Sequence, residues 1–136
     1  MGHQTMGRLP PTRRLLALVF ISAVVVASLP ALAHHGWDWA EEEQTELKGI
    51  ITSISMAPPH PTLTVTTEGG VVWRIELGNP SKTEQSGFAA ATAKPGDAIT
   101  VLGNRHRDKS KMQMKAVRIT IAGKTYDMYP ERIRTN

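Results

Sequence analysis

The 136-residue sequence contains no cysteine, few aromatic residues and only one long apolar run. The absence of cysteine excludes disulfides, thiolate metal sites and cysteine nucleophiles. Aromatic residues make up 5% of the chain. A surface that stacks the bases of single-stranded nucleic acid needs several of them on one sheet face, whereas only Trp73 lies within a clear strand pattern, on a face expected to be buried. What remains is a chain with 40% hydrophobic residues, enough for the core of one small folded domain.

The first 33 residues have the layout of a secretory signal peptide. Basic residues are followed by an apolar run from Leu15 to Leu29 and then by the small residues Ala31 and Ala33. At about 15 residues, the run is shorter than the roughly 20 that a membrane-spanning helix needs. We therefore expect cleavage after Ala33, export to the periplasm, and no stable membrane span after processing. The alternative is an uncleaved anchor.

The net charge of +4 belongs largely to this leader. Arg8, Arg13 and Arg14 leave with it, and the remaining basic and acidic residues are nearly balanced. A general affinity for nucleic acid or for anionic membranes therefore loses its main support, and we expect no nucleic-acid partner.

The rest of the chain divides into three segments. Residues 34–45 lack a strand-like alternation and are expected to form an N-terminal arm. Residues 46–130 contain short β-rich runs separated by Gly and Pro, and residues 131–136 form a polar tail. The expected strands cover residues 47–56, 62–67, 71–77, 98–102, 112–121 and 125–129, with a short helix within 81–93.

Two local patterns predict how the expected strands are connected and where one of them is irregular. Gly69 and Gly70 predict a tight hairpin after the second strand, because glycine accepts the positive φ that such turns require. In the fifth strand the apolar residues change from even to odd positions after Ala116, so we predict a β-bulge near Ala116-Val117.

This order of elements predicts an all-β fold, a five- to six-stranded OB-like antiparallel barrel with one short helix between strands three and four. Closing the sheet would protect the strand edges of so small a domain. The alternatives are another small antiparallel barrel or an immunoglobulin-like sandwich, for which about seven strands would be expected.

Histidines near the cleavage point predict a metal site. If His34 becomes the N-terminus, its amine and its imidazole Nδ1 can chelate one ion, and a further imidazole completes three nitrogens in a plane, which suits Cu(II). His60, in a loop rich in proline, is the expected third ligand, and His35 is its possible replacement. Trp37 and Trp73 are expected to shield the ion. The alternative is a solvated or packing role for this segment.

A second pattern predicts a different kind of binding. Residues 105–111 carry five basic residues, one of them histidine, and one acid, and Arg105, His106 and Arg107 begin this loop at the expected ligand face of the barrel. An anionic envelope component or a protein partner is the expected ligand, whereas a solvated hairpin tip is the alternative. No nucleophile elbow, zinc-binding helix or phosphate-binding glycine loop occurs, so we expect no enzyme activity.

Several short motifs are shared with one known family. They include Ala33-His34-His35 with Gly36-Trp37, Pro59-His60, the run from Trp73 to Leu77, Pro95-Gly96-Asp97, Gly103-Asn104-Arg105 and the run from Tyr126 to Pro130. In these motifs the chain resembles a bacterial exported family catalogued as domain of unknown function 6152. The resemblance implies a periplasmic β-barrel domain without an assigned activity, and it covers His34, His35 and His60.

Overall fold

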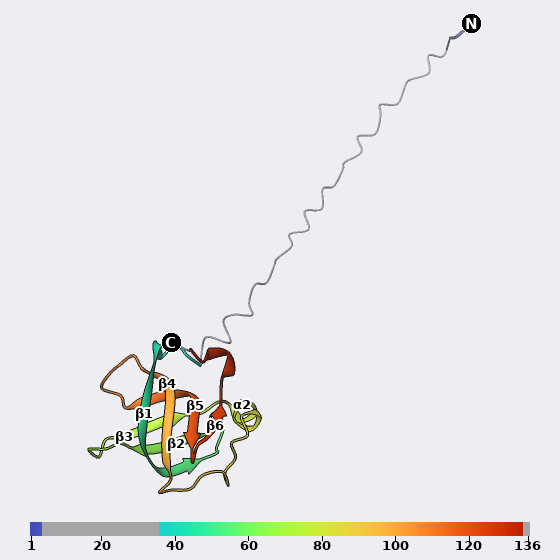
Figure 1. The fold of residues 1–136 in the computed structure, drawn as a ribbon. Coiled ribbons are helices and arrows are strands. Elements are labelled where there is room, and N and C mark those ends of the chain that lie inside the picture. Colours follow the sequence, from blue (N-terminus) through green and yellow to red (C-terminus); the bar gives the residue numbers. More distant parts are fainter. Residues whose placement is uncertain (4–35, 135–136) are drawn as a thin grey trace.

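The computed structural model describes residues 1–3 and 36–134 (Figure 1). The predicted leader beyond residue 3, with His34 and His35, lies outside the described residues. Within residues 36–134, six strands, one α-helix and a 3-10 helix follow one another in the order β1 (Ala40–Ser55), β2 (Thr62–Thr66), β3 (Val72–Glu76), α2 (Pro80–Gln85), β4 (Ala98–His106), β5 (Gln113–Ile121), β6 (Lys124–Asp127) and η1 (Pro130–Arg132).

The strands form one sheet that closes on itself. Their order is β3-β2-β1-β4-β5-β6, and an additional parallel pairing between β3 and β5 completes the ring. The long strand β1 makes this possible, because its residues 40–50 pair with β4 and its residues 50–55 pair with β2. The predicted all-β, OB-like barrel with a short helix between β3 and β4 is confirmed.

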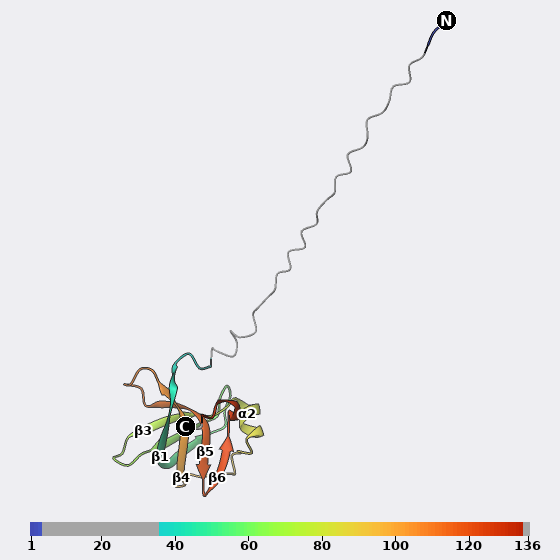
Figure 2. The same ribbon diagram turned by 45° about the horizontal axis from the view of Figure 1, so that its top comes forward.

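Strand β1 begins earlier than the sequence pattern indicates. Residues 40–45 were expected to belong to an arm, yet Ala40, Gln44 and Thr45 pair with β4. A register shift between Ala40 and Gln44 hides the alternation there, because an irregular ladder does not place every second side chain inward. Figures 1 and 2 show the start of β1 beside the loop that joins β4 to β5.

The barrel core is built by alternation along the strands. Leu63 and Val65 of β2 are buried, as are Trp73 and Ile75 of β3, while the residues between them are more exposed. The Gly69-Gly70 turn has positive φ at both glycines, as predicted, and Thr67 N donates to Val71 O across it.

The predicted bulge in β5 is present. Leu102 pairs with Arg118 but Gly103 pairs with Ala116, so Val117 has no partner on β4 in this ladder. As a consequence four successive residues, from Met114 to Val117, are all buried. This stretch includes Lys115, whose burial the apolar pattern alone did not indicate.

Helix α2 is shorter than expected. Asn79 caps it by accepting a hydrogen bond from Lys82 N, Pro80 occupies its first turn, and Gly87 with φ of 87° follows its end. Within the described residues, no helix has the length and apolar character needed to cross a bilayer.

Candidate functional site

His60 lies at one end of the barrel, in the loop between β1 and β2. The loop is held where it enters β2, because Leu77 N donates to Pro61 O at 2.9 Å. The His60 side chain is 27% exposed, but its Nδ1 atom is buried and faces Oε1 of Glu76 at 3.8 Å. Nδ1 has no hydrogen-bond partner among the described residues. One ring nitrogen is thus directed at a carboxylate just beyond hydrogen-bonding distance.

Glu76 is bound to Lys115. The parallel register of β3 and β5 sets these two residues opposite each other. Lys115 Nζ donates to Glu76 Oε1 at 2.8 Å, and the lysine side chain is only 1% exposed. A buried ammonium is costly unless it is paired and hydrogen-bonded, and Glu76 meets this need.

The same ammonium holds the beginning of the folded chain. Lys115 Nζ donates to the carbonyl oxygen of Gly36 at 2.9 Å. It also lies 5.0 Å from the centroid of the Trp37 ring and 5.8 Å from that of Tyr129, within the range of cation–π attraction. The two rings meet edge to face at 4.9 Å. The residue that follows His35 is therefore bound to the same nitrogen as Glu76.

Burial raises the pKa of the Tyr129 phenol above its usual 10.0, and the nearby Glu76 charge acts in the same direction. The ring is therefore kept neutral beside the Lys115 ammonium. A neutral phenol and an indole form an apolar wall around one buried ion pair.

Two potential metal ligands meet at this end of the barrel, the imidazole of His60 and the carboxylate of Glu76. Among residues 1–3 and 36–134, no three His, Asp or Glu side chains gather closely enough to hold a metal ion. A complete site of the predicted kind therefore needs donors from outside the described residues, where His34 and His35 lie.

Trp73 is not brought to His60 by its strand. It lies on the core face of β3 and is 7% exposed, whereas Glu76 lies on the opposite face. The guanidinium of Arg105 covers its ring at 4.7 Å from the centroid. Among the predicted shielding residues, Trp37 is the one that contacts the Lys115 ion pair.

The predicted ligand loop is largely engaged with the barrel itself. His106 stacks on Trp39 at 5.3 Å, and its Nδ1 accepts a hydrogen bond from Asp108 N. Arg107 Nε donates to Ala40 O at 2.9 Å, and Lys109 forms an ion pair with Glu41. Of the three residues expected to begin this loop, Arg105 and His106 belong to β4, and Arg107 lines a pocket.

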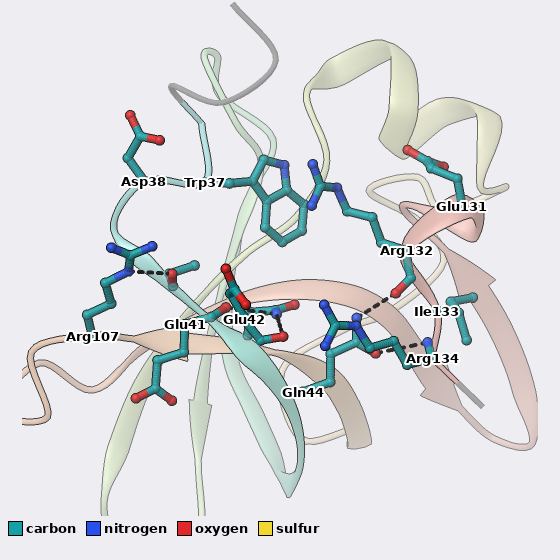
Figure 3. Close-up of a pocket in the computed structure, with 12 residues that line it drawn as sticks. Trp37, Asp38, Glu41, Glu42, Gln44, Arg107, Glu131, Arg132, Ile133 and Arg134 are labelled. Carbon is teal, nitrogen blue, oxygen red and sulfur yellow. Dashed lines mark hydrogen bonds between the residues drawn. The ribbon is translucent and has the colours of Figure 1, made fainter. Parts of the chain in front are cut away.

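That pocket has a volume of about 470 Å³ and lies between the start of β1, the end of β4 and the C-terminal segment (Figure 3). Gln44 joins two of these parts, since its Nε2 donates to Arg132 O at 2.6 Å and its Oε1 accepts from Arg134 N at 3.2 Å. Residues 131–134, expected to be a polar tail, thereby become a wall of the pocket.

Sequence reasoning missed Glu76, Lys115, Tyr129 and Arg132. The apolar pattern gave no signal for Lys115, because a residue between Met114 and Ala116 would face away from the core in a regular strand. The identity of its partner depends on the pairing of β3 with β5, which no local pattern indicates.

Comparison with solved structures is consistent with this fold. The chain is similar to a chain of the S. pombe Stn1–Ten1 complex, with 20% identity and a TM-score of 0.50, covering 60% of this chain and 59% of that chain. It is also similar to the ZRD-deleted mutant of TiaS in complex with agmatine, with 17% identity and a TM-score of 0.49, covering 68% of this chain and 28% of that chain. A third is the mitochondrial single-stranded DNA binding protein Rim1 of S. cerevisiae, with 13% identity and a TM-score of 0.45, covering 59% of this chain and 94% of that chain.

The first of these likenesses concerns the fold alone, and this chain spans 59% of the length of that chain. No curated protein matches the chain. The sequence model of a family of unknown function, DUF6152, matches residues 22–115.

Proposed function

Since the chain belongs to the DUF6152 family, whose function is unknown, we propose a function from its own residues: it is an exported, non-enzymatic domain that binds a copper ion at its processed N-terminus. The observation that carries the proposal is the shared contact of Lys115 with Gly36 O and Glu76 Oε1, with His60 Nδ1 facing that carboxylate. It draws the residue after His35 toward the loop histidine.

The chemistry of the donors favours Cu(II). Cleavage after Ala33 would free the amine of His34, which with its own Nδ1 supplies two nitrogens of one chelate. His60 would supply the third, and His35 is its possible replacement. Neutral nitrogen donors in a plane bind Cu(II) better than they bind harder divalent ions such as Mg²⁺ or Ca²⁺.

Glu76 gives His60 a defined role. When a neutral imidazole donates Nδ1–H to a carboxylate, its Nε2 is left as the metal-binding nitrogen. The distance of 3.8 Å between His60 Nδ1 and Glu76 Oε1 needs only a small closure for that hydrogen bond. Metal binding at Nε2 would favour this closure.

Chain length allows the N-terminus to reach the loop. His34 lies two positions before Gly36, and two extended residues span at most about 7 Å. Because Lys115 already holds Gly36, a smaller part of the chain loses conformational freedom when the ion binds.

The test begins with the exported protein. Its N-terminal mass should correspond to a start at His34, and titration with Cu(II) should give one site per chain with nitrogen hyperfine structure in the EPR spectrum. His60→Ala should weaken binding by roughly tenfold or more. N-terminal acetylation should do the same, because it removes the amine donor.

His106→Ala is the matched control, since that ring stacks on Trp39 and is not an expected ligand. A start downstream of His35, or a Cu(II) affinity that neither His60→Ala nor acetylation lowers, would overturn the proposal.

A further inference from the structure

The pocket beside Trp37 is a second candidate site. Its volume of about 470 Å³ is in the usual range for small-molecule sites. Three guanidinium side chains approach it, those of Arg107, Arg132 and Arg134 (Figure 3). They come from the end of β4 and from the C-terminal segment, so only the tertiary structure collects them.

Two of these guanidinium groups are held in place by uncharged partners, so no carboxylate in the described part of the chain neutralises them. The Arg132 guanidinium lies 4.1 Å from the centroid of the Trp37 ring. Arg107 donates its Nε to Ala40 O, and its two Nη groups donate no hydrogen bond to the described residues. Among the described residues, none of the three arginines forms an ion pair with a carboxylate.

The acids of the pocket are partly neutralised by other residues. Glu41 pairs with Lys109, and Glu131 lies 3.5 Å from Lys82. Glu42 and Asp38 also line the wall. Glu42, which is exposed, opposes an anion in the pocket and should reduce its affinity.

Asn104 lines the same wall and carries an enclosed hydrogen-bond acceptor. Its side chain amide donates through Nδ2 to the carbonyls of Glu41 and Glu42, at 2.9 and 3.2 Å. The residue is 6% exposed, and its Oδ1 has no partner among the described residues. A buried acceptor without a partner is costly, and a ligand O–H or N–H that displaces the wall slightly to reach Oδ1 would remove that cost.

We propose that this pocket binds a small oxyanion, a carboxylate or a phosphate, carried by a molecule that also bears a hydroxyl or amino group. The oxyanion accepts hydrogen bonds from Arg107, Arg132 and Arg134, and the hydroxyl or amino group donates to Asn104 Oδ1. This binding is separate from the proposed copper site, because none of these groups is one of its expected ligands.

Titration of the metal-free mature protein tests the proposal. The probes are glycerol 1-phosphate, inorganic phosphate, lactate and glycerol. Binding of each is measured by calorimetry and by the NMR shift of the Trp37 indole N–H. We expect saturable binding of glycerol 1-phosphate or lactate, and the comparison of the two distinguishes phosphate from carboxylate. Inorganic phosphate should bind more weakly than its glycerol ester, and glycerol should not bind.

Variants test the residues. Arg107→Gln and Arg132→Gln should each weaken binding by roughly tenfold, as the loss of a charge-assisted hydrogen bond predicts. Glu42→Gln should strengthen it, and His60→Ala should leave it unchanged. Lys124→Gln is the matched control, because that lysine lies over Tyr126, outside the pocket.

The proposal is overturned if none of the probes binds saturably. It is also overturned if binding is insensitive to both arginine substitutions, or as sensitive to Lys124→Gln as to them.

Discussion

Lys115 Nζ lies 2.9 Å from the carbonyl oxygen of Gly36, a residue 79 positions earlier in the chain. This contact binds the first described residues of the folded domain to β5, and through Glu76 to β3. The start of the folded chain is therefore part of the barrel end. Trp37 serves both candidate sites, because it contacts the Lys115 ammonium and the Arg132 guanidinium.

Removing one charge of the Glu76–Lys115 ion pair should destabilise the fold more than removing both, because a single remaining charge is buried without its partner. Glu76→Met leaves the Lys115 ammonium buried without its carboxylate, and we expect a loss of roughly 3–5 kcal/mol in the free energy of unfolding. The double variant Glu76→Met with Lys115→Met should recover most of this loss, because two apolar chains need no partner. Urea denaturation of the two single variants and the double variant measures the coupling. Additive losses would contradict the prediction.

Gly103 should not tolerate a side chain. A methyl group there would overlap the carbonyl oxygen of Lys115 and lie 2.9 Å from Met114 Cγ. Since Gly103 faces the bulge of β5, Gly103→Ala should cost about 1–3 kcal/mol or more of unfolding free energy. Gly36→Ala is the matched control, as its methyl group would meet only Lys115 Nζ at 3.5 Å. Equal thermal stability of the two variants would contradict this account.

Tyr129 should make the protein sensitive to alkali. Burial raises the pKa of its phenol in the folded state above 10.0, so the unfolded chain ionises first as the pH rises. This contribution to stability is present below about pH 10 and is lost above it, at no more than about 1.4 kcal/mol per pH unit. Tyr129→Phe should flatten that loss. The measurement is urea denaturation of both proteins from pH 8 to 11, and parallel curves would refute the prediction.

Arg118 and Asp127 join β5 to β6 with two hydrogen bonds, at 2.6 and 3.1 Å. Hydrogen bonding from Arg118 lowers the pKa of Asp127 below 3.8, so the pair stabilises the fold above that pH and loses its effect as the pH falls further. Because both side chains are about one third exposed, Asp127→Asn should cost less than about 1 kcal/mol at pH 7. The difference from the unmodified protein should vanish near pH 2, which acid unfolding followed by circular dichroism would reveal.

The fold could be predicted from local patterns because its strands alternate in the usual way. Leu63 and Val65 indicated the core face of one strand, and Trp73 and Ile75 that of the next. The change of the apolar residues from even to odd positions at Val117 indicated the bulge. The same reasoning failed at residues 40–45, where an irregular ladder removes the period of two. It also overextended α2, since composition does not say where a short helix ends.

The candidate sites were predicted only in part. His60 was identified from its chemistry and from its proline-rich loop, and Arg107 from its place in a basic segment. Neither pattern contained their neighbours. Glu76 meets His60 and Lys115 only because β3 and β5 run side by side, and Arg132 meets Trp37 because Gln44 ties the C-terminal segment to β1.

By itself the sequence determined the order of the strands, the turns between them and most of the apolar side chains that avoid water, since each follows from preferences of residues close together in the chain. The tertiary structure alone decided which charges became partners. Closure of the barrel brings together residues from opposite ends of the chain, and the cost of burying an ammonium then requires that a carboxylate and a carbonyl be placed beside it.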